Sequence, residues 1–220
     1  TKSWSGMRKK HLEILLSKLA PHPKPKLRWE EYTLDAGSAT QIAYIPLVND
    51  DISGKSVIDL GCGTGILAIS ASLLKARFVV AVDIDKDAVR VAEVNAKTVE
   101  AEVEFVIGDI SCIGGHFDTA LMNPPFGSWR HGADVEFLKK ALEVADVVYS
   151  LHKRVGLNRE FLCRKIQTFG GKVDRIYEVT ISIPRIFSFH RKHRYLVDAD
   201  LYRIFKNPVL GSAPLCDRKN

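Results

Sequence analysis

Four consecutive residues, Asn123, Pro124, Pro125 and Phe126, combine groups that could hold a flat molecule bearing an amino group. The apolar run 117–122 before them is typical of a buried strand, which two prolines cannot continue. The prolines also keep the turn stiff and extended. Asn123 and the Pro124 carbonyl could then accept two N–H bonds, while the Phe126 ring stacks on a base. The alternative is an ordinary turn that ends a strand.

The elements that must position this turn alternate between strands and helices. The apolar patterns predict strands over 55–60, 78–82, 102–107, 117–122, 147–151, 173–183 and 195–205. They predict helices over 7–20, 66–74, 87–98, 135–145 and 158–169. A further helix is predicted in the segment 39–48, where Pro46 should end it. This alternation indicates an α/β fold with a doubly wound, mostly parallel sheet. No helix separates the last two strands, so we expect an antiparallel C-terminal hairpin at one edge.

Polar and glycine residues follow four of the predicted strands. Gly61–Gly65, Asp83, Asp109 and Asn123 each stand where a strand ends. Ligands of doubly wound sheets bind beyond the carboxyl ends of the strands, so these residues should meet along one rim. Four motifs at one rim favour a binding site over chance.

The glycine loop and the acidic residues indicate which cofactor the rim would take. The loop reads G-x-G-x-G, with Ile66 where a dinucleotide fingerprint needs Gly or Ala, and no Gly-Lys-Ser/Thr follows it. Asp83 could accept both hydroxyls of a ribose. Asp109 could contact an adenine amino group, with the Ile110 backbone N–H as a further donor. A nucleoside without phosphate, S-adenosyl-L-methionine, fits better than NAD.

Composition and charge bound the remaining possibilities. The chain has 220 residues, 46% hydrophobic and 26% charged, with no apolar run long enough for a membrane span and no apparent signal peptide. Its four widely spaced cysteines form no C-x-x-C pair, so we expect no metal site, reduced thiols and a cytoplasmic location.

The net charge of +6 and pI near 9.1 favour a polyanionic partner such as RNA. Two basic stretches could contact it: 24–28, which could equally be a solvated linker, and 190–194 between the last two strands. Lys153 and Arg154 could hold phosphates, whereas His152 is given no catalytic role.

These motifs resemble the class I S-adenosylmethionine-dependent methyltransferases that carry a D/N-P-P-Y/F motif. The similarity is closest to the methyltransferase-like protein 5 family of ribosomal RNA adenine-N6 methyltransferases. The residues that carry it are 57–66, Asp83, Asp109 and the segments 122–127, 149–153 and 189–192. Residues 30–32 also resemble a Glu-Gln-Tyr segment near the start of the family's sequences. Here Glu31 replaces the family's Gln, and Thr33-Leu34 replaces Pro-Thr, so a cofactor contact at Leu34 is not carried over.

The resemblance implies a seven-stranded Rossmann-like sheet and one methyltransferase domain over residues 7–206. Within it, 7–48 is an N-terminal helical segment and 55–206 the core, and 207–220 is a tail. It also implies a small zinc-binding activator subunit as a partner. The implied catalytic residues are Asn123, Pro124, Pro125 and Phe126. The implied cofactor contacts are Glu31, Gly61, Thr64, Ile66, Asp83, Asp109 and Ile110.

The expected reaction is methyl transfer to an adenine N6 in RNA, with small-subunit ribosomal RNA as the substrate. Asn123 and the Pro124 carbonyl would position the amino group without a covalent intermediate, and Phe126 would stack on an unpaired or flipped base. The main alternative is a protein glutamine N5 methyltransferase, because its nucleophile is also a planar nitrogen. A non-catalytic binding module and an NAD oxidoreductase are less favoured.

Overall fold

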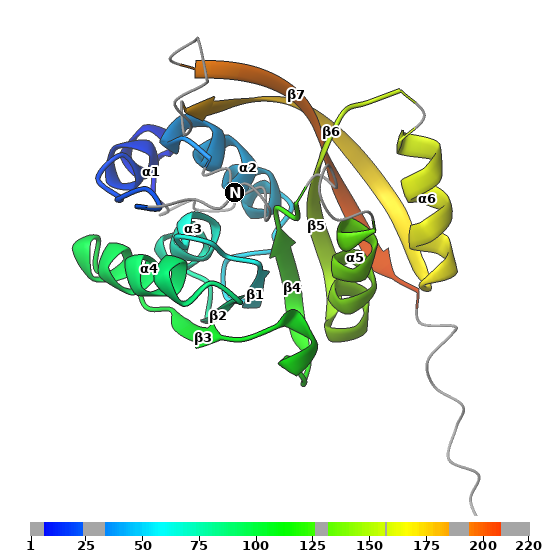
Figure 1. The fold of residues 1–220 in the computed structure, drawn as a ribbon, viewed down its shortest axis with the longest axis horizontal. Coiled ribbons are helices and arrows are strands. Elements are labelled where there is room, and N and C mark those ends of the chain that lie inside the picture. Colours follow the sequence, from blue (N-terminus) through cyan, green and yellow to red (C-terminus); the bar gives the residue numbers. More distant parts are fainter. Residues whose placement is uncertain (1–6, 24–33, 126–131, 157, 185–193, 208–220) are drawn as a thin grey trace, which may run out of the picture.

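A single mixed sheet runs through the protein (Figure 1). The structure is a computed structural model that describes residues 7–23, 34–125, 132–156, 158–184 and 194–207. The seven strands have the order β3-β2-β1-β4-β5-β7-β6. The first five strands in this order pair in parallel, whereas β7 is antiparallel to both β5 and β6. The predicted mostly parallel sheet with an antiparallel C-terminal hairpin is therefore confirmed.

The observed bounds follow the predicted order of elements. The strands are β1 (Ser56–Leu60), β2 (Phe78–Asp83), β3 (Glu104–Ile107), β4 (Phe117–Met122), β5 (Ala145–Lys153), β6 (Gly171–Pro184) and β7 (Arg194–Lys206). The helices are α1 (Lys9–Leu16), α2 (Ala36–Val48), α3 (Ile66–Leu73), α4 (Lys86–Thr98), α5 (Ala133–Val144), α6 (Asn158–Thr168) and the short 3-10 turn η2 (Ile110–Cys112). None of the helices in these described ranges is long and apolar enough to cross a membrane.

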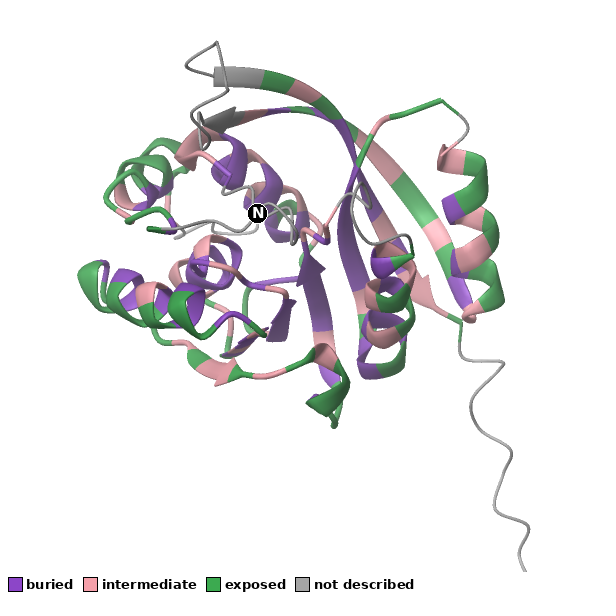
Figure 2. Ribbon diagram, in the orientation of Figure 1, coloured by how far each residue is buried: buried purple, intermediate pink, exposed green. Residues whose placement is uncertain are grey.

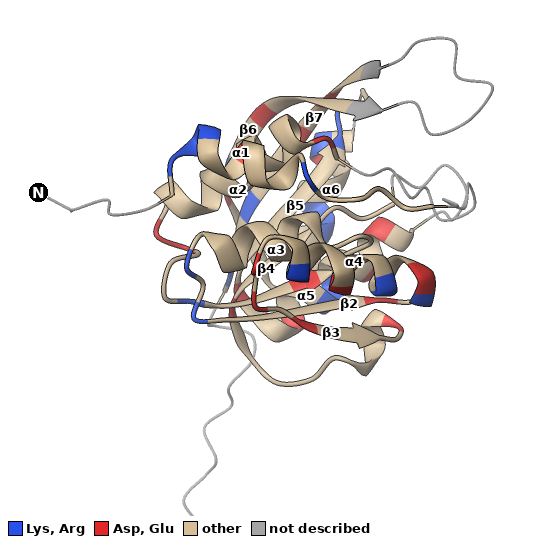
Figure 3. Ribbon diagram, turned by 90° about the vertical axis from the view of Figure 1, so that its left-hand side faces the viewer, with Lys and Arg blue, Asp and Glu red and all other residues tan. Residues whose placement is uncertain are grey.

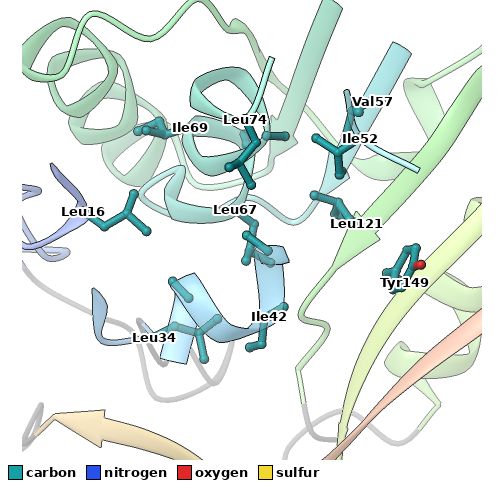
Figure 4. Close-up of a cluster of buried hydrophobic side chains, with 14 of the residues drawn as sticks. Leu16, Leu34, Ile42, Ile52, Val57, Leu67, Ile69, Leu74, Leu121 and Tyr149 are labelled. Atoms are coloured by element: carbon teal, nitrogen blue, oxygen red, sulfur yellow. The ribbon is translucent and has the colours of Figure 1, made fainter. Parts of the chain in front are cut away.

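Helices cover both faces of the sheet, and each face has its own apolar core (Figures 1 and 2). On one face, α1, α2 and α3 pack against alternate residues of the central strands, including Leu121 and Tyr149 (Figure 4). On the other face, α5 and α6 pack against Met122 and Val148. Strand β1 is buried along its whole length, as expected for a central parallel strand.

Two predicted helix boundaries are wrong. α2 continues through Pro46 to Val48, and α1 ends at Leu16 rather than reaching residue 20. Pro46 is buried in the last turn of α2, so its burial offsets the backbone hydrogen bond that a proline cannot donate. Tertiary burial has thus overridden a local helix-breaking signal.

The hairpin of β6 and β7 reaches beyond the end of its neighbour. The last pair between β5 and β7 is Lys153 with Ala199, but β6 and β7 continue to pair from Thr180↔Asp198 to Pro184↔Arg194. We call these paired residues, 180–184 and 194–198, the ribbon. The side-chain oxygen of Ser38, in the first turn of α2, accepts from the Ser182 N–H at 2.8 Å. The ribbon is therefore anchored to α2.

A buried ionic cluster links the loop before β1 to strands β5 and β7. The Asp51 carboxylate accepts from the Tyr149 hydroxyl at 2.6 Å and from Arg203 Nε at 2.9 Å. Arg203 also pairs with Asp174 at 2.8 Å. Burial and the Asp51 carboxylate both raise the pKa of Tyr149, so this tyrosine is neutral and donates its proton.

We predict that Asp51→Ala lowers the free energy of unfolding by about 3 kcal/mol, because it leaves the buried guanidinium and phenol without their shared acceptor. Asp174→Ala removes the more exposed partner of the same Arg203 and should cost less than about 1 kcal/mol. Urea titrations of both variants measure the difference. Equal losses for the two variants would contradict the role given to the buried carboxylate.

Candidate active site

The sheet register aligns the ends of the parallel strands along one rim. Leu60 of β1 pairs with Val82 of β2 and with Met122 of β4. The next residue on each of these strands is therefore Gly61, Asp83 or Asn123, side by side. Neighbouring strands lie about 4.8 Å apart, so Asp83 and Asn123 are separated by roughly 10 Å across the glycine loop. The predicted convergence of these residues on one rim is observed.

Gly61 and Gly63, in the loop between β1 and α3, are glycines for different reasons. Gly61 has a φ of 72°, and a Cβ there would lie 2.7 Å from the Phe137 ring. Gly63 has a φ of 53°, but a Cβ there would meet nothing within 4 Å. Its conformation requires glycine, and its surface is open. A ligand can therefore approach the Gly63 backbone closely.

The Asp83 carboxylate is oriented by two backbone donors. Its Oδ2 accepts from the Gly63 N–H at 2.7 Å, and its Oδ1 accepts from the Asp85 N–H at 2.8 Å. Each oxygen retains one acceptor site, so the pair could receive two vicinal hydroxyls. Asp85 rather than Asp83 caps α4, since it accepts from the Asp87 and Ala88 N–H groups. Burial is the main cause that raises the pKa of Asp83, and the two N–H donors oppose it.

A second buried carboxylate, Asp59, lies in β1 beneath the glycine loop. Its Oδ2 accepts from the Ala68 N–H of α3 at 3.0 Å, whereas Oδ1 has no hydrogen-bond partner in the described part of the chain. Burial raises the pKa of Asp59 to about 7; the Ala68 N–H opposes this shift, and the negative charge of Asp83 adds to it.

Asn123 has a buried acceptor that the described residues leave unused. Its Oδ1 is inaccessible to solvent and accepts no hydrogen bond from any described residue. Pro124 beside it is buried and has no N–H to offer. A buried carbonyl oxygen without a donor costs about 1–3 kcal/mol, a cost that a bound N–H donor would remove. The side chain is thus prepared to receive such a group.

The remaining predicted residues lie near this rim or outside the described ranges. Thr64 is buried in the glycine loop, and Ile66 is the first residue of α3. Asp109 caps η2, accepting from the Ser111 N–H at 2.9 Å, and Ile110 follows it. Glu31 and Phe126 lie outside the described residues, as do the basic stretches 24–28 and 190–193. Pro125 is half-buried beside Pro124.

Arg154 and His152, at the end of β5, make contacts within the protein, whereas Lys153 between them is exposed. Arg154 donates to Asp200 at 3.1 Å and pairs with Glu178 at 3.3 Å, so its guanidinium is already committed to two carboxylates. Lys153, by contrast, is exposed and better suited to a phosphate. His152 is buried against Tyr202, and burial lowers its pKa to about 4, so the ring is neutral.

Three residues of the rim were missed in the sequence. Ile84 is 55% exposed between Asp83 and Asp85, where it offers an apolar surface beside the carboxylate. Asn95 is fully buried on the apolar side of α4, and His22 lies 3.8 Å from Asp85. A polar Asn on the buried face of a helix was a visible signal, because such residues need specific partners. Nothing in the local sequence indicated the contact of His22.

The raised pKa of Asp59 gives a pH dependence of stability in the cofactor-free protein. Its folded pKa of about 7 exceeds the unfolded value. The stabilising contribution is therefore complete below about pH 4 and is lost as the pH rises through about 7. We predict that Asp59→Asn removes this loss, as measured by urea titrations from pH 4 to 8.

Asp118 provides the opposite control. Its carboxylate accepts from the N–H and hydroxyl of Ser56, both at 2.7 Å, and these bonds lower its pKa. Its contribution is present above its unfolded pKa and is lost as the pH falls. Asp118→Asn should therefore alter only the acid side of the profile. An Asp59→Asn profile that parallels the wild type through pH 7 would refute the assignment.

Comparison with known proteins places this geometry in a family. The model of the methyltransferase small domain matches residues 29–147. The rRNA N(6)-adenosine-methyltransferase METTL5 of Danio rerio is 35% identical over 90% of this chain and 98% of its own length. An uncharacterized protein of Methanocaldococcus jannaschii is 36% identical over 91% of this chain and 95% of its own length. The crystal structure of a proposed RNA methyltransferase from Pyrococcus horikoshii has a TM-score of 0.84 at 40% identity, covering 91% of this chain and 98% of that chain.

The rim, the glycine loop and the strand order agree with these matches. The chain therefore belongs to the methyltransferase small domain family of class I S-adenosylmethionine-dependent methyltransferases, in the group that includes METTL5.

Proposed function

We propose that this methyltransferase transfers a methyl group to the N6 atom of an adenine in ribosomal RNA. The observation that carries the proposal is the unused acceptor of Asn123, buried at the rim one strand away from the glycine loop. An exocyclic amino group has two N–H donors, and Asn123 with the Pro124 carbonyl supplies two acceptors on a stiff turn. This arrangement suits a planar amine better than a hydroxyl or a thiol.

The cofactor is S-adenosylmethionine, which supplies an electrophilic methyl group on a sulfonium when it is bound. We propose that Asp83 accepts the ribose hydroxyls and that the open face of Gly63 lies against the cofactor. Glu31, Gly61, Thr64, Ile66, Asp109 and Ile110 complete the proposed contacts. The chain's part in the chemistry is positioning: Asn123 and Pro124 hold both amino hydrogens so that the nitrogen lone pair faces the methyl group.

The distribution of charge supports RNA as the substrate. Lys, Arg, Asp and Glu are interspersed over the described elements (Figure 3). Ten of the 32 Lys and Arg, but only three of the 26 Asp and Glu, fall in the segments outside the described ranges. One of these basic segments precedes α2 in the sequence and another connects β6 to β7, and the described parts of α2 and β6 meet where the Ser182 N–H donates to Ser38. Basic residues flanking a site favour a phosphate backbone.

Methylation of a protein glutamine is less well supported. The matching N5-glutamine methyltransferase of Methanocaldococcus jannaschii, which carries that assignment as putative, aligns over 34% of this chain at 36% identity. The rRNA methyltransferases of Danio rerio and Drosophila melanogaster align over 90% and 87%. The similarity to the RNA enzymes thus extends over most of the chain, and this favours RNA over a protein glutamine as the substrate.

We also propose a small zinc-binding activator subunit as a partner. Strand β3 is at the edge of the sheet and carries Ile107, which is 56% exposed. An edge strand with an exposed apolar residue can pair with a strand of another chain. Co-expression with candidate zinc proteins followed by gel filtration tests this, and Ile107→Glu should abolish co-elution.

The ribose assignment predicts that Asp83→Ala weakens S-adenosylmethionine binding by about 1–3 kcal/mol, the cost of lost hydrogen bonds to a charged acceptor. Isothermal calorimetry measures it. Asp87→Ala is the matched control, because Asp87 lies four residues on, is exposed and, among the described residues, forms an ion pair only with Arg90 at 3.5 Å. Unchanged affinity in Asp83→Ala would overturn the assignment.

The positioning role predicts that Asn123→Ala cuts turnover at least about a hundredfold, or roughly 3 kcal/mol, while cofactor affinity stays nearly unchanged. Asn123→Asp keeps an acceptor oxygen and should retain more activity than the alanine variant. Phe126→Ala should instead raise the KM for RNA, because stacking acts before the reaction. Mass spectrometry of digested RNA should show N6-methyladenosine; methylglutamine in protein, or full activity of Asn123→Ala, would refute the proposal.

RNA capture by the stretch 190–194 predicts that charge reversal at Arg191 and Lys192 lowers RNA affinity and flattens its salt dependence. Cofactor binding should be unaffected. Filter-binding titrations at several salt concentrations measure the slope. Reversal at Lys24 and Lys26 is the comparison, and an unaltered slope in the first variant would assign RNA binding to the second stretch.

A further inference from the structure

The N-terminal segment 7–23, which we call the arm, packs on elements far from it in sequence. Leu12 and Leu16 of α1 are buried in the core with α2 and α3. The Tyr44 hydroxyl of α2 donates to the Met7 carbonyl. After α1 the chain turns toward the glycine loop, and residues 20–22 lie along its edge. The proposed function gives these residues no role.

Asn95 joins the arm to the glycine loop by three hydrogen bonds. Its Oδ1 accepts from the Ala20 N–H at 2.7 Å, and its Nδ2 donates to the Ala20 carbonyl at 3.0 Å. Nδ2 also donates to the Thr64 carbonyl at 3.1 Å. Asn95 is 2% exposed. A buried amide with both its donors and its acceptor used fixes the groups that it contacts.

Two residues further along the arm, His22 makes a second contact with the rim. Its Nε2 lies 3.8 Å from Asp85 Oδ2, and both side chains are almost fully buried. The Asp85 N–H donates to Asp83, whose other oxygen accepts from Gly63. His22 is thus connected through Asp85 to the carboxylate of Asp83.

These contacts close a ring around the carboxylate of Asp83. It runs from Ala20 through Asn95 to Thr64 and Gly63, from there to Asp83 and Asp85, and back to the arm at His22. We propose that residues 20–22 form a wall of the cofactor site and that Asn95 is a positioning residue that couples the arm to the glycine loop. A ligand that orders the loop then also favours the docked arm, and the docked arm favours the ligand to the same extent.

The test measures cofactor binding and arm protection separately, without RNA. In the wild type, S-adenosylmethionine should slow hydrogen exchange of the Ala20 amide, the donor to Asn95, several-fold. Asn95→Ala should weaken S-adenosylmethionine binding in calorimetry by about tenfold, the effect of losing one buried hydrogen-bond set. It should also abolish the effect of the cofactor on Ala20 exchange.

Thr98→Ala is the matched control, because Thr98 is on the same helix and, among the described residues, its hydroxyl donates only within that helix, to the Val94 carbonyl at 2.9 Å. It should leave affinity and arm exchange unchanged. Fast Ala20 exchange together with unchanged affinity in Asn95→Ala would overturn the coupling. So would a cofactor effect on Ala20 exchange that survives the substitution.

If Asn95→Ala does not fold, His22→Ala provides the decision, because it removes the second contact of the arm with the rim and leaves Asn95 in place. Its cofactor affinity should fall at least threefold, and the amide of Ala20 should exchange faster in the complex; wild-type values for both would overturn the proposal. Because neither measurement uses RNA, loss of the proposed RNA activity would not affect the outcome.

Discussion

The fixed carboxylate of Asp83 is the constraint on which the rim depends. It holds the Gly63 N–H from one loop and the Asp85 N–H from another, so it connects the turn after β1 to the start of α4. This connection requires β2 to end level with β1, which the parallel register provides. It also requires a positive φ at Gly63, which only glycine adopts cheaply. Moving any one of these parts would leave a buried charge without its donors.

Carboxylates concentrate beneath the rim. Asp59 and Asp85 are buried and Asp83 is half-buried, and the Asp59 pKa of about 7 reflects the cost of placing charge there. Backbone N–H groups offset part of that cost at each residue. The remaining negative potential suits a cofactor that carries a sulfonium and an ammonium group. The adjoining turn at Asn123 is uncharged, as suits a neutral amine.

The order of elements and the four rim motifs could be predicted from the sequence, because both depend on local signals. These signals are the periodicity of the strands and the Gly, Asp and Pro residues that follow them. The effect of Pro46 was predicted wrongly, since its burial could not be seen from its neighbours in the sequence. Asn95 and Ala20 are 75 residues apart, and no local pattern indicates their pairing. Arg154 was read as a phosphate ligand, but Asp200 and Glu178, which occupy it, come from later strands. The long-range polar contacts could not be predicted, because they depend on the complete fold.

Beyond the end of β5 the two strands of the ribbon pair with each other, with added bonds from the Ser182 N–H to Ser38 and from the Arg154 N–H to Asp198. The register of the sheet is therefore set before the connection that closes the ribbon. The connection between its two strands can therefore change in length at a small cost, about 0.6 kcal/mol of closure entropy for each doubling. The rim and the outer end of the hairpin can thus diversify independently. We infer that related enzymes can acquire a different substrate specificity by exchanging this connection, while the sheet and the rim stay unchanged.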